Sequence, residues 1–194
     1  LQECLLHPIT QIMKRFHFEE YSDQRWQHNL TEAVSNTFGS QKGISTASGP
    51  IFYCTPESFR PQRLHSCRRV ETQDVPSLQE VGLYSSSLNQ SISEGACFAA
   101  FHIDIPVALS GTHVVPHMPD AIGDLNVPGT LEAYRRRGFG KTVVSYTTEA
   151  ILAQGKVPIY ATSDWNIASA RTSQAVGYVQ YGWQFRVQVS KECE

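Results

Sequence analysis

The stretch TLEAYRRRGFGK, residues 130–141, decides how the rest of the chain is interpreted. It follows an apolar, strand-like segment, Ala121–Leu131, and leads into a helix predicted over Lys141–Gln154. Two glycines one residue apart allow main-chain conformations that a Cβ hinders, and they let a ligand approach closely. The free N–H groups and the positive dipole end at the start of the helix form an anion site that fits a pyrophosphate. The positive charge around this site comes from four side chains: Arg135, Arg136, Arg137 and Lys141.

The same stretch also fits a simpler interpretation, because Gly-x-Gly before a helix is common in tight strand-to-helix turns. A second segment favours the anion site. Val157–Thr162 is typical of a buried strand, and a polar turn containing Asn166 follows it. A helical pattern then runs to Val176 and ends at Gly177-Tyr178.

These motifs, in this order and spacing, resemble the Gcn5-related N-acetyltransferase (GNAT) superfamily over roughly Cys67 to Val189. The family pattern Arg/Gln-x-x-Gly-x-Gly/Ala is met by Arg135, Gly138 and Gly140. The resemblance implies an α/β (α+β) GNAT fold: a mixed central sheet with a splayed, bulged strand pair and flanking helices. It also implies acetyl-CoA as the cofactor, bound by Thr130, Leu131, Arg135, Arg136, Arg137, Gly138, Phe139, Gly140, Lys141, Asn166 and Ser169.

The predicted division is an N-terminal extension or accessory lobe, residues 1–65, and a GNAT domain, residues 66–194. Leu1 to Phe38 is predicted to be partly helical: one helix carries Ile9, Ile12, Met13 and Phe16, and a second carries Trp26, Leu30 and Val34. Gly39–Gly49 is predicted to be a loop, and Ile51–Cys54 a short strand.

The domain itself is expected to begin with a strand at Ser66–Val70 and a helix from Val75 that Asp74 caps. Two further strands are predicted at Ala96–Ile103 and Val107–Val115, and a closing strand at Tyr181–Val189. The loops expected to shape the acceptor site are Tyr84–Ser93, which could also form a second helix, and Val115–Asp120. Pro128-Gly129 interrupts the strand before the glycine turn, and a bulge is expected there because proline cannot sit in a regular central ladder.

Composition narrows the class of partner. A net charge of −2 indicates no bulk attraction to nucleic acid or to an anionic membrane. The five cysteines show neither a Cys-x-x-Cys pair nor a metal-ligand spacing, so no metal is expected. Reduced thiols and a location in the cytoplasm are expected instead. No apolar run is long enough to span a membrane, and no signal segment is recognised at the start. A homodimer is left open.

The expected chemistry is attack of an amine on the acetyl thioester. Because an amine with a pKa near ~10 is mostly protonated at neutral pH, a base is needed. Asp124, on the strand before the motif, lies close to where several GNAT enzymes place a carboxylate; His102, His113 and His117 are alternatives. The tyrosine that many GNAT enzymes carry as general acid is replaced by Ser173.

The sequence therefore predicts an N-acetyltransferase for a primary amine of a small molecule or amino-acid-like acceptor, working by direct attack in a ternary complex. The alternative is a GNAT-fold module that binds acyl-CoA or a partner without turnover, which the missing tyrosine favours. A different nucleotide binder is disfavoured, because the three-glycine dinucleotide fingerprint is absent.

Overall fold

The computed structural model of the protein describes residues 9–17, 43–113 and 122–190, together with five helical residues: His28, Asn29, Glu32, Ala33 and Asn36. The chain divides into two compact units. The smaller unit comprises Leu1–Ile51, Thr162–Asn166 and Tyr181–Glu194, and the larger comprises Phe52–Ala161 and Ile167–Gln180. The division predicted at residue 65 stays a prediction.

Eight strands form a mixed sheet. In the larger unit the order is β7-β6-β5-β4-β3, and every neighbouring pair is antiparallel except β6 with β7, which is parallel. The bounds of these strands are β3 Cys67–Arg69, β4 Phe98–His102, β5 Ile105–His113, β6 Ile122–Thr130 and β7 Val157–Ala161. The predicted strands of the domain are thereby confirmed to within a few residues.

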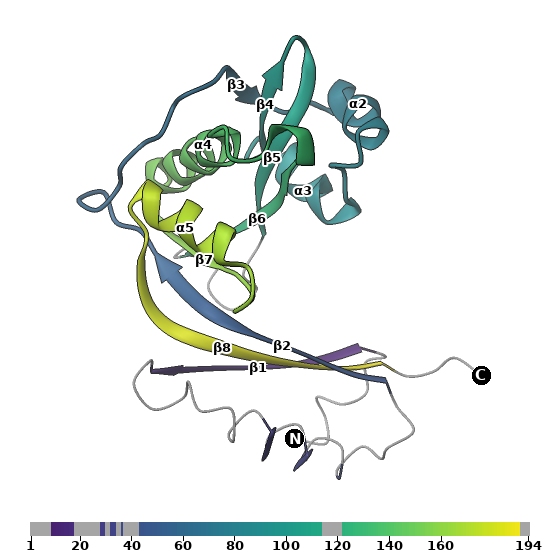
Figure 1. The fold of residues 1–194 in the computed structure, drawn as a ribbon, viewed down its shortest axis with the longest axis vertical. Coiled ribbons are helices and arrows are strands. Elements are labelled where there is room, and N and C mark those ends of the chain that lie inside the picture. Colours follow the sequence, from purple (N-terminus) through teal and green to yellow (C-terminus); the bar gives the residue numbers. More distant parts are fainter. Residues whose placement is uncertain are drawn as a thin grey trace. The chain divides into compact units, whose positions relative to one another are not determined.

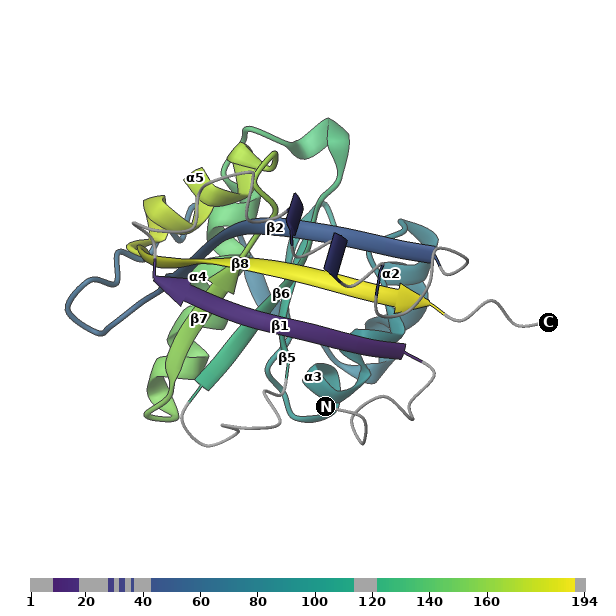
Figure 2. The ribbon, with the colours of Figure 1, turned by 90° about the horizontal axis from the view of Figure 1, so that it is seen from below.

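The described part of the smaller unit holds three strands. β1 (Ile9–His17) pairs antiparallel with β8 (Val179–Ser190), and β2 (Gly43–Tyr53) lies on the other side of β8, as Figure 2 shows. β2 and β8 both run on into the larger unit, where the Cys54 N–H donates to the Pro158 carbonyl of β7 at 3.0 Å.

Helices cover both faces of the sheet in the larger unit (Figure 1). Adjacent residues of β5 must point to opposite faces. Leu109 packs in one core cluster with Ile92 of α3 (Asn89–Ser93), whereas its neighbour Ala108 packs in another with Phe139 and Val143 of α4 (Phe139–Ala153). α4 thus lies on one face, and α3 with α2 (Val75–Glu80) on the other. α5 (Ile167–Val176) packs against α4.

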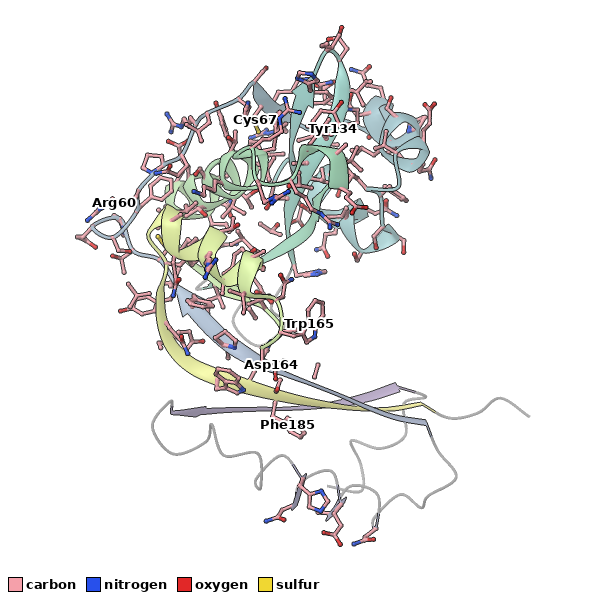
Figure 3. All side chains as sticks on the ribbon, in the orientation of Figure 1. Arg60, Cys67, Tyr134, Asp164, Trp165 and Phe185 are labelled. Carbon is pink, nitrogen blue, oxygen red and sulfur yellow. The ribbon has the colours of Figure 1, made fainter. Side chains whose placement is uncertain are left out.

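Among the described residues the core has three clusters. One lies between α4 and α5 and consists of Phe52, Cys54, Leu125, Val144, Ile151, Tyr160, Val176 and Tyr178. A second, beneath α2 and α3, consists of Val70, Leu78, Leu83, Leu88, Ile92, Cys97, Ala99 and Leu109. A third, beneath the first turns of α4, consists of Ala100, Val107, Ala108, Phe139 and Val143, and Cys67 and Tyr134 pack against its edge (Figure 3). Each large apolar side chain removed from water contributes about 1.5–3 kcal/mol, so these clusters hold the sheet and the start of α4 together.

Three local predictions were wrong. Ile9 to Phe16, predicted as helix from their spacing, belong to strand β1. All nine residues of β1 pair with β8, so pairing with a distant strand decides the structure here instead of the local pattern. Gly43–Gly49, predicted as loop, belongs to β2. Asp74 does not cap α2: its carboxylate accepts from the Glu71 N–H at 2.9 Å and pairs with Arg68, closing a short 3-10 turn before the helix.

Other predictions fall outside the described residues, namely Trp26, Leu30, Val34, His117 and the loop at 115–120. Within the described part of the chain, no helix combines the length and the apolar run that crossing a bilayer requires. No group of three His, Cys, Asp or Glu side chains there comes together in a way that could hold a metal ion. Cys54, Cys67 and Cys97 carry free thiols.

Candidate functional site

The strand before the glycine turn is bulged where proline predicts it. Leu109 of β5 pairs with Gly129 of β6, and Gly111 pairs with Asn126. One residue of β5, Ser110, therefore faces two residues of β6, which is the definition of a β-bulge. Gly129 has a φ of +121°, a conformation that a residue with a Cβ rarely adopts.

β6 and β7 pair over only part of their lengths. The parallel ladder joins Ile122–Asp124 to Val157–Ile159. β6 continues to Thr130 and β7 to Ala161, yet no further ladder pair joins them along these described strands. The main chain of β6 beyond Asp124 is thus free of this partner strand, as a splayed strand pair requires.

The glycine turn presents the start of α4. Gly138 is its N-cap residue with a φ of +91°, and Arg136 also has a positive φ, +59°. No described group accepts a hydrogen bond from the N–H groups of Phe139, Gly140 or Lys141, and the first bond of the helix runs from Thr142 N–H to the Gly138 carbonyl at 3.1 Å. Left-handed residues beside free N–H groups form an anion-binding concavity, and the helix dipole adds to it.

The basic side chains of the turn have no acidic partner among the described residues; the ion pairs there join Arg63 to Glu149 and Arg68 to Asp74. Arg135 donates from Nε to the Thr130 carbonyl at 3.3 Å. The Arg137 guanidinium lies 5.3 Å from the ring centre of Tyr134 and 5.6 Å from that of Phe139. These charges are therefore available to an anion without competition from a carboxylate of the described residues.

Leu131, one of the acetyl-CoA contacts that the family resemblance implies, has its main-chain donor already in use. The Leu131 N–H donates to the Val107 carbonyl at 2.9 Å. Ala108 and Thr130, the adjacent ladder pair, are therefore a non-hydrogen-bonded pair, and the Thr130 N–H points away from β5.

The connection between β2 and β3 binds along α4. We call residues 55–66 the strap. The Arg60 N–H donates to the Val176 carbonyl at 2.8 Å, the Gln62 N–H to Ser145 Oγ at 2.9 Å, and the Leu64 N–H to Thr142 Oγ1 at 3.2 Å. The hydroxyl side chains of α4 thus satisfy the extended main chain of the strap, and they bring its last residues to the glycine turn.

His65, at the end of the strap, contacts that turn directly. Its ring stacks on the Phe139 ring with 3.7 Å between centroids and 14° between planes, and Nε2 lies 2.6 Å from the Arg137 carbonyl oxygen. His65 was not predicted as a site residue, because nothing local in the sequence links position 65 to position 137.

Three of the candidate bases, Asp124, His102 and His113, lie among the described residues, and they occupy two different places in the sheet. Asp124 and His113 are directly paired across β5 and β6, with Asp124 half-buried and His113 exposed. His102 lies at the other end of the β4–β5 hairpin, paired with Ile105, and its ring is 5.3 Å from that of Tyr134. The eight steps from Ile105 to His113 along β5, at about 3.3 Å each, put roughly 26 Å between the two places, so His102 and His113 cannot serve the same reacting atom.

Asp124 lies near a buried tyrosine pair. Burial raises the pKa of Tyr178 well above its ordinary value; a hydrogen bond with Thr148 (2.7 Å) lowers it in part, and the charges of Cys54, Tyr160 and Asp124 raise it further. Burial also raises the pKa of Tyr160, whose hydroxyl lies 2.8 Å from Ser169 Oγ. Both phenols therefore stay protonated at neutral pH.

The residues of the second motif lie in different units. Asn166 belongs to the smaller unit, where its N–H donates to the Ser163 carbonyl at 3.0 Å, and Ser169 belongs to the larger. Ser173, which stands where the family often has a tyrosine, is fully buried and donates to the Ala170 carbonyl at 2.8 Å. Its hydroxyl is committed to its own helix.

Comparison with solved structures identifies the architecture. A GNAT-family protein from Novosphingobium aromaticivorans is 13% identical, with a TM-score of 0.63, covering 98% of this chain and 79% of that one. A GNAT-family acetyltransferase from Colwellia psychrerythraea is 14% identical, with a TM-score of 0.61, covering 88% and 74%. A GCN5-related N-acetyltransferase from Sphaerobacter thermophilus is 13% identical, with a TM-score of 0.62, covering 93% and 59%. No protein-family model and no curated protein sequence matches the chain.

Proposed function

We propose, from the GNAT fold of this chain, that it is an acetyl-CoA-dependent N-acetyltransferase. It would move the acetyl group to a primary amine of a small molecule or amino-acid-like acceptor by direct attack in a ternary complex. The observation that carries the proposal is the start of α4, where three successive N–H groups lack a described acceptor beside a bulged strand that leaves its neighbour.

The described residues fit acetyl-CoA. A diphosphate needs donors and positive charge, which the N–H groups of Phe139–Lys141 and the arginines of the turn supply. It also needs close approach to the main chain, and Gly140 has no side chain to obstruct it. The thioester arm would lie along β6 where β7 is no longer paired with it. Thr130, Leu131, Asn166 and Ser169 are the further proposed contacts.

The acetyl thioester is already activated, so the protein must deprotonate the amine, hold it in line and stabilise the oxyanion. Asp124 is the proposed base, acting directly or through water, and His113 beside it is the alternative. Because the Leu131 N–H is bonded within the sheet, and the Gly129 N–H lies in the same hydrogen-bonding register, the proposed oxyanion donor is the N–H group of Thr130.

Two measurements test the proposal. Isothermal titration with acetyl-CoA, NAD and ATP should show binding of acetyl-CoA alone, because the turn lacks a dinucleotide fingerprint. Thiol release with a panel of small amines should then show turnover. Binding of NAD or ATP in place of acetyl-CoA would overturn the proposed ligand class.

One observation favours a second function, acyl-CoA binding without catalysis. Ser173 is buried and hydrogen-bonded to Ala170, so the residue at the usual acid position cannot protonate the leaving thiolate. A thiol with a pKa near ~8.5 can leave without an acid, which is why transfer remains the main proposal. Tight acetyl-CoA binding with no thiol release across the panel would decide for the binding module.

A further inference from the structure

We propose that His65 is a positioning residue of the acetyl-CoA site, fixing the peptide plane through which the glycine turn offers its N–H groups to the diphosphate. This inference rests on the proposed function and deepens it. His65 lies outside both sequence motifs, at the end of the strap, 72 residues before the carbonyl that it contacts.

The contact has a defined direction. The Arg137 carbonyl oxygen can only accept a hydrogen bond, so the 2.6 Å contact requires His65 Nε2 to carry the hydrogen and donate it. Nε2 lies at the edge of the imidazole, and one face of the ring stacks on Phe139. Phe139 is 2% exposed and belongs to the cluster beneath the first turns of α4. His65 is therefore a donor fixed on a rigid apolar surface.

Because the peptide bond is planar, this contact also sets the direction of the next N–H group, that of Gly138. In a trans peptide the C=O and the following N–H point in opposite directions. Because the Arg137 carbonyl points at His65, the Gly138 N–H points away from the strap. A flip of this peptide would exchange the two, and would present a carbonyl oxygen in place of a donor to an approaching diphosphate.

The turn needs such a restraint. Gly138 can adopt many backbone conformations, and Arg136 holds a positive φ that non-glycine residues seldom adopt. A left-handed arginine persists when the surrounding structure over-determines the turn. Arg137 lies between Arg136 and Gly138, and its hydrogen bond with His65 supplies that restraint from outside the turn.

Two substitutions separate the donor from the ring. His65→Phe keeps an aromatic ring on Phe139 but removes the donor, and His65→Gln keeps an amide donor without the ring. Gln62→Ala is the matched control, because Gln62 is bonded to α4 through its main-chain N–H, which the substitution keeps. Each variant is first checked for a thermal midpoint near that of the wild type.

We expect His65→Phe to weaken CoA binding about tenfold, the effect of one hydrogen bond of ordinary strength. His65→Gln should retain most of the wild-type affinity for CoA. The KM for acetyl-CoA should rise with kcat unchanged at saturation, since the contact acts on binding. In the ligand-free protein, the Gly138 amide resonance should shift in His65→Phe and remain in place in Gln62→Ala.

Wild-type CoA affinity in His65→Phe, or an unmoved Gly138 amide, would overturn this inference and leave the proposed function standing. Failure of the wild type itself to bind CoA would instead overturn the proposed function, and the role of His65 with it.

Discussion

At the scale of single residues, Gly138 is the position where backbone conformation and the proposed ligand binding meet. Its φ of +91° costs a residue with a Cβ about 1–2 kcal/mol. A Cβ there would also lie 2.7 Å from Leu64 Cδ1 and 3.5 Å from His65 Nε2. Gly138→Ala should lower the free energy of unfolding by about 1–2 kcal/mol and weaken acetyl-CoA binding at least tenfold, as measured by denaturant unfolding and titration calorimetry.

Gly82 supplies the matched control, because its φ is +73° and nothing lies within 4 Å of the Cβ that an alanine would add. Gly82→Ala should show a similar loss of stability and unchanged acetyl-CoA binding. Equal effects of the two substitutions on acetyl-CoA binding would mean that the turn is not the anion site.

Asp124 is the residue that tests catalysis. Asp124→Asn keeps the size of the side chain and removes the base, so kcat should fall about 10²–10⁴-fold while acetyl-CoA affinity changes little. Thiol-release kinetics measure the first quantity and calorimetry the second. His113→Gln should have a smaller effect, and so should His102→Gln at the other end of β5. Unchanged turnover in Asp124→Asn would transfer the role to a histidine or to water.

At the scale of elements, the strap tests where the functional domain begins. Three main-chain bonds join it to α4 and α5, and its residues belong to the same compact unit as β3 to β7. A chain that begins at residue 66 would leave Thr142 and Ser145 without their strap donors and would uncover that side of α4. It should therefore unfold at a lower temperature than the full chain and bind acetyl-CoA more weakly, by scanning calorimetry and titration.

Equal stability and affinity of the shortened chain would instead support the boundary predicted at 65/66. A chain that begins at residue 52 keeps the strap and loses β1 and most of β2, and it provides the comparison for any general effect of truncation.

The elements also show what a sequence can and cannot give. The helix α4, the hairpin strands and the bulge at Pro128-Gly129 were predicted, because each follows from local periodicity or from the chemistry of one residue. β1 was not, because its nine pairs with β8 connect residues about 170 positions apart. His65 was missed for the same reason: its stacking on Phe139 exists only after the strap has bound α4.

At the scale of the whole molecule, buried thiols predict how stability depends on pH. Burial raises the pKa of Cys67 to about 12, with a further contribution from nearby Cys97, and burial raises that of Cys97 to about 12. In the unfolded chain these thiols ionise near pH ~8.5. Between about pH 9 and 12 the folded state therefore holds more protons, so the free energy of unfolding should fall as pH rises, by up to ~1.4 kcal/mol per pH unit for each thiol.

Urea unfolding across this range measures the effect. The double variant Cys67→Ala/Cys97→Ala should show a flatter decline than the wild type, whatever its stability at neutral pH. Burial raises the pKa of Cys54 as well, so a Cys54→Ala variant should flatten the decline by a smaller amount, the contribution of one thiol. An unaltered slope in the double variant would show that these two thiols do not carry the dependence.

The most direct test of the central claim is a crystal structure of the protein with CoA bound. We expect diphosphate oxygens at hydrogen-bond distance, about 2.7–3.2 Å, from the N–H groups of residues 138–141, with the pantetheine arm along β6 beyond Asp124. A diphosphate bound elsewhere, or β6 and β7 paired over their full lengths with no room for the arm, would contradict that claim.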